Sequence, residues 1–268
     1  MERHAVNRDD LQMLTPRPKP KTPRIWNDII ETGSHFIELQ LFILAFGTGI
    51  QDAVVYPQFG CFVSNQTGNT VVFAVAVLSH LGHDRINASV SIPAIATSLG
   101  VFLASVFSTG QLANYLQAVR RRWWLLTTSL LQCVLLAIAT ALLYQLPEAS
   151  HPSSNLSLIT IALLAFSSGA QVGMVRALKI TDITTAMATA AWIDIFIDPN
   201  WAAALTKNKE RNRRAGFLLC LVVGSFVGAA AHATMGAGFA IILSLIARLL
   251  ATGTCLISPK TIFRELES

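Results

Sequence analysis

A break of small or polar residues at 64–70 interrupts an apolar stretch at 60–79, GCFVSNQTGNTVVFAVAVLS. The break offers amide and hydroxyl groups, together with a glycine that permits close backbone approach. Irregular backbone at membrane depth is tolerated only where it is buried in protein or lines a wet cavity. We therefore predict substrate-binding residues here; packing of small residues between helices is the alternative. The predicted residues are Asn65, Thr67, Gly68, Asn69 and Thr70.

Two further polar residues, Gln51 and Asp52, lie inside the apolar stretch before the break. A carboxylate is costly within a membrane, so Asp52 is a candidate for solute binding and for proton coupling. The alternative is a structural role, in which Asp52 pairs with Arg176 or accepts hydrogen bonds from backbone N–H groups of the break. Gln51 either lines the same cavity or forms hydrogen bonds between helices.

An internal repeat relates the two halves of the chain. LAFGTGIQ at 44–51 matches LAFSSGAQ at 164–171, and VSN at 63–65 then aligns without a gap with ITT at 183–185. The second half thus adds Gln171, Thr184 and Thr185 to the predicted substrate-binding residues. Repeats that each carry an interrupted short segment are typical of transporters with a site between the repeats. Chance similarity between apolar helices is the alternative.

The composition indicates the class of protein. Hydrophobic residues make up 53% of the chain and charged residues 13%, whereas soluble domains carry about 25% charged residues. Apolar stretches lie at 36–56, 62–81, 91–115, 123–144, 157–177, 182–198, 215–234 and 236–257. This pattern predicts an all-α integral membrane protein, with the lipid bilayer as its surroundings.

The apolar stretches also divide the chain. Residues 1–35 form a basic, proline-rich arm that ends in a predicted short interfacial helix, 36–257 form a single transmembrane domain, and 258–268 form a tail. The repeat halves are about 36–144 and 157–257. The basic residues lie in short loops and in the arm, which indicates topology and not nucleic-acid binding. No nucleotide-binding fingerprint or metal-ligand spacing is present, so we expect no cofactor and no metal.

Two topologies fit the eight apolar stretches. If all eight cross the membrane, the basic residues fall on both sides. If the second and sixth stretches are re-entrant, six helices cross, the halves form an inverted repeat, and both termini and nearly all basic residues are cytoplasmic, as the positive-inside rule favours. Each re-entrant stretch is then expected to dip to the midplane in extended form and return as a short helix. Arg248 is expected near the inner end of the last helix, where it snorkels to the interface.

The segments GIQDAVVY and VSNQTGNTVV, at 49–56 and 63–72, resemble the YoaK-type family of multi-pass membrane proteins, a domain of unknown function. The resemblance covers roughly 36–255. It implies an integral membrane protein of about six helices and no established substrate or reaction. In the second half the chain lacks the Thr-Gly pair that the family often carries, since Ala188-Thr189 stands there.

These features favour a secondary transporter or permease for a small polar or anionic solute, with its site at the repeat interface and two helix N-termini directed at it. A membrane scaffold or regulator that uses the basic arm and the 207–214 loop is the first alternative. An intramembrane aspartyl-type hydrolase using Asp52 and Asp194 is the second, although the glycine-rich context of such aspartates is absent. We therefore expect no enzymatic activity.

Overall fold

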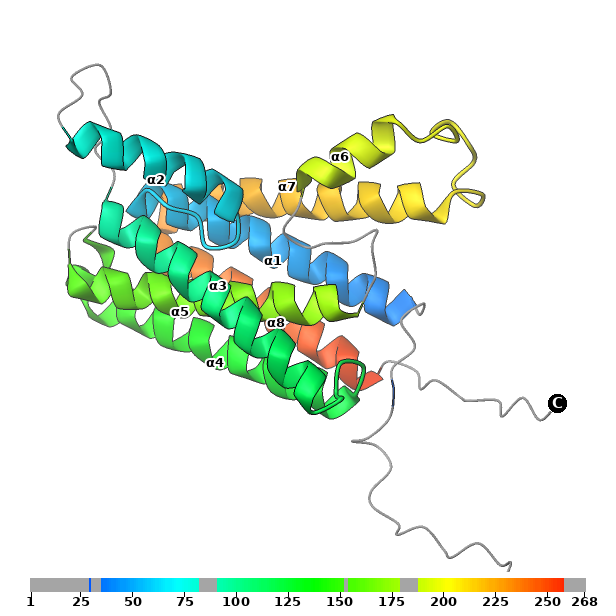
Figure 1. Ribbon diagram of the computed structural model, residues 1–268, viewed down its shortest axis with the longest axis horizontal. Coiled ribbons are helices and arrows are strands. Elements are labelled where there is room, and N and C mark those ends of the chain that lie inside the picture. Colours follow the sequence, from blue (N-terminus) through cyan, green and yellow to red (C-terminus); the bar gives the residue numbers. More distant parts are fainter. Residues whose placement is uncertain (1–28, 30–34, 82–90, 152–153, 179–187, 258–268) are drawn as a thin grey trace, which may run out of the picture.

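The computed structural model describes residues 29, 35–81, 91–151, 154–178 and 188–257 (Figure 1). The predicted interfacial helix before residue 35 lies outside the described residues, apart from Ile29, which pairs with Arg121 in an isolated β-bridge. The described residues form eight α-helices and one short 3₁₀ helix. They are α1 (His35–Phe59), α2 (Gln66–His80), α3 (Ile92–Tyr115), α4 (Arg122–Gln145), η2 (Pro147–Ser150), α5 (Asn155–Ala177), α6 (Ala188–Phe196), α7 (Lys209–Met235) and α8 (Ala237–Ile257).

Six of these helices, α1, α3, α4, α5, α7 and α8, are long and apolar enough to cross a membrane. Large apolar side chains remain exposed on their outer faces, for example Phe107 on α3 and Phe226 on α7, as expected where lipid takes the place of water. The 15 residues of α2 and the 9 residues of α6 span only about 22 and 14 Å at 1.5 Å per residue, less than a hydrocarbon core of about 30 Å. The predicted all-α, multi-pass membrane fold is confirmed.

The six long helices run in alternating directions, so that the ends of different helices meet at two ends of the bundle (Figure 1). At one end, Arg122 donates to the Leu256 carbonyl at 2.9 Å, and Arg213 bonds to Glu38. At the opposite end, Gln58 donates to the Ser150 carbonyl at 2.6 Å.

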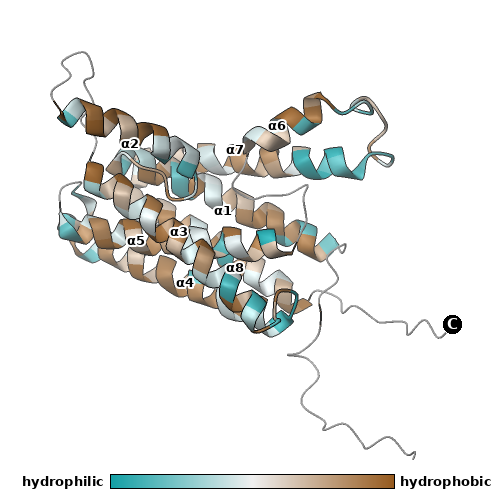
Figure 2. Ribbon diagram, in the orientation of Figure 1, coloured by the Kyte–Doolittle hydropathy of each residue, from teal (hydrophilic) through white to brown (hydrophobic). Residues whose placement is uncertain are grey.

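Positive charge is concentrated at the first of these ends. Hydrophilic residues gather there at the start of α7 and at the α3–α4 connection (Figure 2). Among the described residues, every Lys and Arg except Arg248 lies at this end: Arg120, Arg121, Arg122, Arg176, Lys207, Lys209, Arg211, Arg213 and Arg214. We call it the basic end.

The bundle is held together by two sets of helix contacts. Helix α1 packs mainly against α7 and α8, whereas α5 packs mainly against α3 and α4, and α4 and α8 join the two sets. Glycines allow the backbones to approach closely within each set. A Cβ at Gly224 of α7 would lie 2.1 Å from the Phe46 carbonyl oxygen of α1, and one at Gly169 of α5 would lie 2.6 Å from the Phe102 carbonyl oxygen of α3.

The substitution Gly224→Ala should therefore destabilise the bundle, because a methyl group at 2.1 Å from backbone must push α1 and α7 apart. We expect a cost of about 1–3 kcal/mol, measured as a lower unfolding temperature in detergent. Gly100→Ala is the matched control, since nothing lies within 4 Å of its added Cβ, and should be neutral or slightly stabilising. Equal unfolding temperatures for the two variants would contradict the close α1–α7 contact.

The bundle interior contains two apolar clusters, one toward each end. The cluster at the basic end includes Leu44, Leu126 and Ala251, and the other includes Ile50, Leu136 and Ile241. Between them, halfway along the helices, lies a layer of buried polar side chains that we call the middle layer. Its members, each at most 4% exposed, are Thr48, Gln51, Ser105, Gln132, Ser167, Ser168, Gln171, Ser244 and Arg248.

Candidate functional site

A short irregular segment at 60–65 connects α1 to α2, whereas residues 66–70 of the polar break form the first turn of α2. Helix α1 ends at Phe59, and Gly60 follows with a φ of 70°, a left-handed conformation that favours glycine. Helix α2 begins after Asn65, whose side-chain oxygen accepts a hydrogen bond from the Gly68 N–H at 3.1 Å. Asn65 is thus the N-cap of α2. The start of α2 lies near mid-length of α1, and α2 leads back to the end opposite the basic end (Figure 1).

The carboxylate of Asp52 binds the backbone of this segment. Its Oδ1 accepts from the Val63 N–H at 2.9 Å and from the Ser64 N–H at 3.0 Å, and its Oδ2 accepts from the Ser64 hydroxyl at 2.5 Å. An ionised carboxylate only accepts hydrogen bonds, so it fits these three donors. Of the two structural partners considered from the sequence, the N–H groups of the break are therefore the ones observed.

The side chain of Asn69 holds the same segment from the other side. Its Oδ1 accepts from the Phe62 N–H and its Nδ2 donates to the Phe62 carbonyl, both at 2.8 Å. The Nδ2 also donates to Gln66 at 2.7 Å and to Ser98 of α3 at 3.2 Å. Asn69 is fully buried, and its amide replaces the partners that Phe62 would have in a regular helix.

The other predicted residues of the break do not point into the bundle. Thr67 and Thr70 are exposed, and the Thr70 hydroxyl donates to the Gln66 carbonyl one turn earlier, at 2.8 Å. Gly68 makes room for an aromatic ring, since a Cβ there would lie 2.9 Å from Phe62. Phe62 stacks on Tyr56 with ring centroids 4.5 Å apart. Thr184 and Thr185 lie outside the described residues.

The structure brings Gln51 and Gln171 together in the middle layer, where α1 crosses α5. Gln51 accepts from the Ser168 hydroxyl at 3.1 Å, and Gln171 donates to the Thr48 hydroxyl at 3.1 Å. Gln51 also donates to Ser244 of α8 at 2.7 Å. Both glutamines are 1% exposed, yet the Oε1 of Gln171 has no hydrogen-bond partner among the described residues.

The position of Arg248 differs from the prediction that it lies near the inner end of the last helix. It does not snorkel to the interface, because it lies in the middle of α8, is 2% exposed, and donates through Nη1 to Oε1 of Gln132 on α4. Sequence reasoning did not identify Gln132 as a partner of Arg248. One sequence pattern did indicate that Arg248 faces the interior. Ser244, Arg248 and Thr252 are spaced by four residues and so share one face of α8, and all three are buried.

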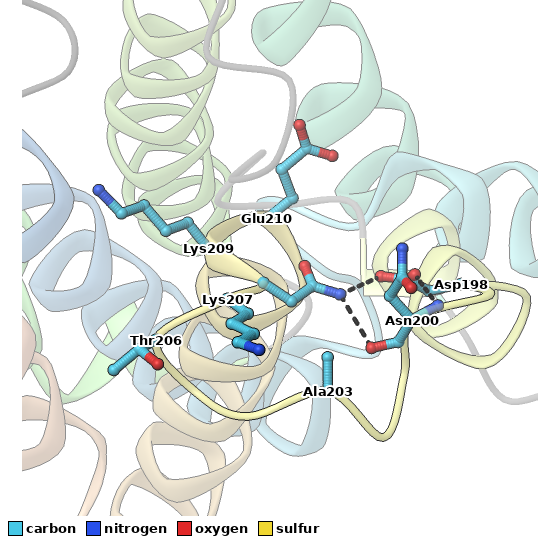
Figure 3. Close-up of a pocket in the computed structure, with 8 residues that line it drawn as sticks. Asp198, Asn200, Ala203, Thr206, Lys207, Lys209 and Glu210 are labelled. Carbon is cyan, nitrogen blue, oxygen red and sulfur yellow. Dashed lines mark hydrogen bonds between the residues drawn. The ribbon is translucent and has the colours of Figure 1, made fainter.

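The α6–α7 hairpin carries the two remaining aspartates of interest. Asp194 lies 3.4 Å from Arg214 in an ion pair. Asp198 accepts from the Asn208 amide at 2.7 Å and from the Asn200 N–H at 2.8 Å, and these hydrogen bonds lower its pKa below the usual value (Figure 3). A hollow of about 600 Å³ lies at this hairpin tip. Asp52 and Asp194, the two aspartates considered above for an aspartyl-type hydrolase, thus bind different partners. In the described part of the chain, no three His, Cys, Asp or Glu side chains form a group that could hold a metal ion.

Comparison with known proteins places this architecture in one family. Neither the curated proteins nor the solved structures gave a match to the chain. A family model described as a protein of unknown function, DUF1275, matches residues 40–254, from within α1 to within α8 and including the break, and the predicted YoaK-type membership agrees with it. The chain therefore belongs to the DUF1275 family of proteins of unknown function.

Proposed function

We propose that this protein is a secondary transporter or permease for a small polar or anionic solute, which passes through the middle layer. The observation that carries this proposal is the middle layer itself, in which five of the long helices, α1, α3, α4, α5 and α8, each place buried polar side chains near their mid-length. An ionisable side chain inside a membrane domain is costly and marks a functional site by default, and the middle layer contains the buried Arg248. The unpartnered Oε1 of Gln171 supports the same interpretation, because a solute donor would complete its hydrogen bonding.

The contacts around the middle layer support an inverted repeat. The pairs Thr48/Ser168 and Gln51/Gln171 are each 120 residues apart, and each glutamine bonds to the hydroxyl of the other half. Helices α1 and α5 run in opposite directions, and α1 packs on α7 as α5 packs on α3. In such transporters the two halves rock about a site between them, which opens it to each side in turn.

The break has a different part in this proposal from the one expected from the sequence. Asp52 and Asn69 bind the backbone of the segment between α1 and α2, so solute contact falls to Gln51 and Gln171 among the predicted residues that the structure describes. The short helices α2 and α6 both begin near the middle of the bundle and lead to opposite ends of it (Figure 1). The basic end is assigned to the cytoplasmic side by the positive-inside rule, which also places both termini there.

Solute entry into proteoliposomes tests the proposal. Stopped-flow light scattering after an osmotic step follows vesicle swelling with urea, glycerol, or potassium formate, acetate or nitrate, with valinomycin carrying potassium. Wild-type protein should accelerate entry of at least one solute over protein-free vesicles. Gln171→Leu should slow that entry by about tenfold or more, which corresponds to about 1.4 kcal/mol in the barrier, because it removes the polar contact at the crossing of α1 and α5.

Gln145→Leu is the matched control, since Gln145 is exposed at the end of α4. It should transport as the wild type does. Equal entry rates for the wild type and Gln171→Leu would remove the middle layer from the pathway. The absence of entry for every solute in the panel would favour a scaffold or regulator.

A further inference from the structure

Arg248 places a positive charge in the bundle interior without an acidic partner among the described residues. Its guanidinium donates to the neutral Oε1 of Gln132. The acidic side chains of the described α-helices are engaged elsewhere: Glu38 with Arg213, Asp194 and Glu210 with Arg214, and Asp52 with the backbone of the break. A buried charge without a counter-charge costs several kcal/mol, so this arrangement calls for an acceptor.

The side-chain amide of Gln132 also has an N–H donor without an acceptor. Its Oε1 is taken by Arg248, and its Nε2, on a residue that is 0% exposed, has no hydrogen-bond partner in the part of the chain that the structure describes. The hydroxyls on the same face of α8 donate to backbone carbonyls, Ser244 to Gly47 and Thr252 to Arg248. Two adjoining buried groups therefore offer N–H donors, and the nearby side chains do not supply the acceptor.

We propose that Arg248 and Gln132 form a binding site for a small monovalent anion, such as a halide or formate. This anion is the solute class of the permease proposed above, and in that respect the inference rests on the proposed function. An anion supplies both the missing charge and the missing acceptor. One guanidinium and one neutral amide match a single negative charge, because a dianion would leave a net negative charge in the bundle interior. The site lies in the middle layer, four residues along α8 from Ser244, which bonds to Gln51.

Anion-dependent unfolding of the purified protein in detergent tests binding without requiring transport. The unfolding temperature is measured in sodium chloride, sodium formate and sodium gluconate at equal ionic strength. The wild type should unfold about 5 °C or more higher in chloride or formate than in bulky gluconate, because a ligand that binds only the folded state stabilises it. Arg248→Met should lose this difference while remaining folded, since replacing a buried charge by an apolar side chain is often tolerated.

Gln132→Glu is the most informative variant, because it places a carboxylate beside Arg248 that has nearly the same shape as the amide it replaces. It should raise the unfolding temperature in gluconate and abolish the response to chloride and formate. Gln145→Glu, at the exposed end of the same helix, is its control and should respond as the wild type does. Identical wild-type unfolding temperatures in the three salts, or an unchanged response in Arg248→Met, would overturn the anion site.

The two proposals can fail separately. An anion response that depends on Arg248, without anion entry in proteoliposomes, would keep the site and remove the transport function. Entry of urea or glycerol through a protein that does not respond to anions would keep transport and remove the anion site.

Discussion

The variant Asp52→Leu is expected to yield little folded protein. Leucine is similar in size to aspartate but accepts no hydrogen bond, so the N–H groups of Val63 and Ser64 and the Ser64 hydroxyl all lose their acceptor. A buried polar group left without a partner costs about 1–3 kcal/mol, and water cannot replace the acceptor at membrane depth. The unfolding temperature in detergent should fall by about 10 °C, with a matching loss of the monodisperse peak in size-exclusion chromatography.

Asp52→Asn separates the hydrogen bonds from the charge. Its side-chain oxygen still accepts from both backbone N–H groups, and its amide can donate to the Ser64 hydroxyl, so it should fold with only a small loss of stability. If Asp52→Leu were as stable as Asp52→Asn, the carboxylate would not be holding the break, and the proton-coupling role considered from the sequence would gain support.

Asn69→Leu is expected to lower the amount of folded protein without changing the solute entry rate per folded molecule. The substitution leaves the Phe62 N–H without an acceptor, whereas the Phe62 carbonyl keeps its bond from the Ser98 hydroxyl at 2.6 Å. One unsatisfied buried donor and the lost bond to Gln66 should lower the unfolding temperature by about 5 °C. Unfolding and flux, both normalised to the monodisperse fraction, distinguish this structural role from solute contact.

The neighbouring Thr70→Val is the control for Asn69→Leu. Thr70 is exposed and donates only to a carbonyl within its own helix, so its loss should change the unfolding temperature little. An Asn69→Leu protein that folds normally but transports nothing would return Asn69 to the solute site, as the sequence first indicated.

Much of the fold could be predicted from local patterns. The apolar stretches and their charge distribution indicated six long helices and two short ones. The interruption before the second short helix was recognisable from its small and polar residues, although only 64–65 of the break are irregular and 66–70 begin α2. These features depend on residues near one another in the sequence.

The roles of individual polar residues could not be predicted in the same way. Gln51 and Asp52 are adjacent, but successive residues of a helix point about 100° apart, so Gln51 faces α5 and α8 and Asp52 faces the break. Which of the two reaches the interior depends on contacts with helices more than a hundred residues away. Arg248 was misjudged for the same reason, because its partner Gln132 is 116 residues distant.

The pairing of α1 with α7 and α8 affects how the chain folds during synthesis. The first long helix to be made packs mainly on the last two, and at about 5–20 residues per second they follow roughly 10–40 s later. During that interval Gln51 lacks its partner Ser244, which lies on the last helix to be made. Truncation before α7 therefore removes the main packing partners of α1, and we expect it to leave this helix open to quality-control proteases.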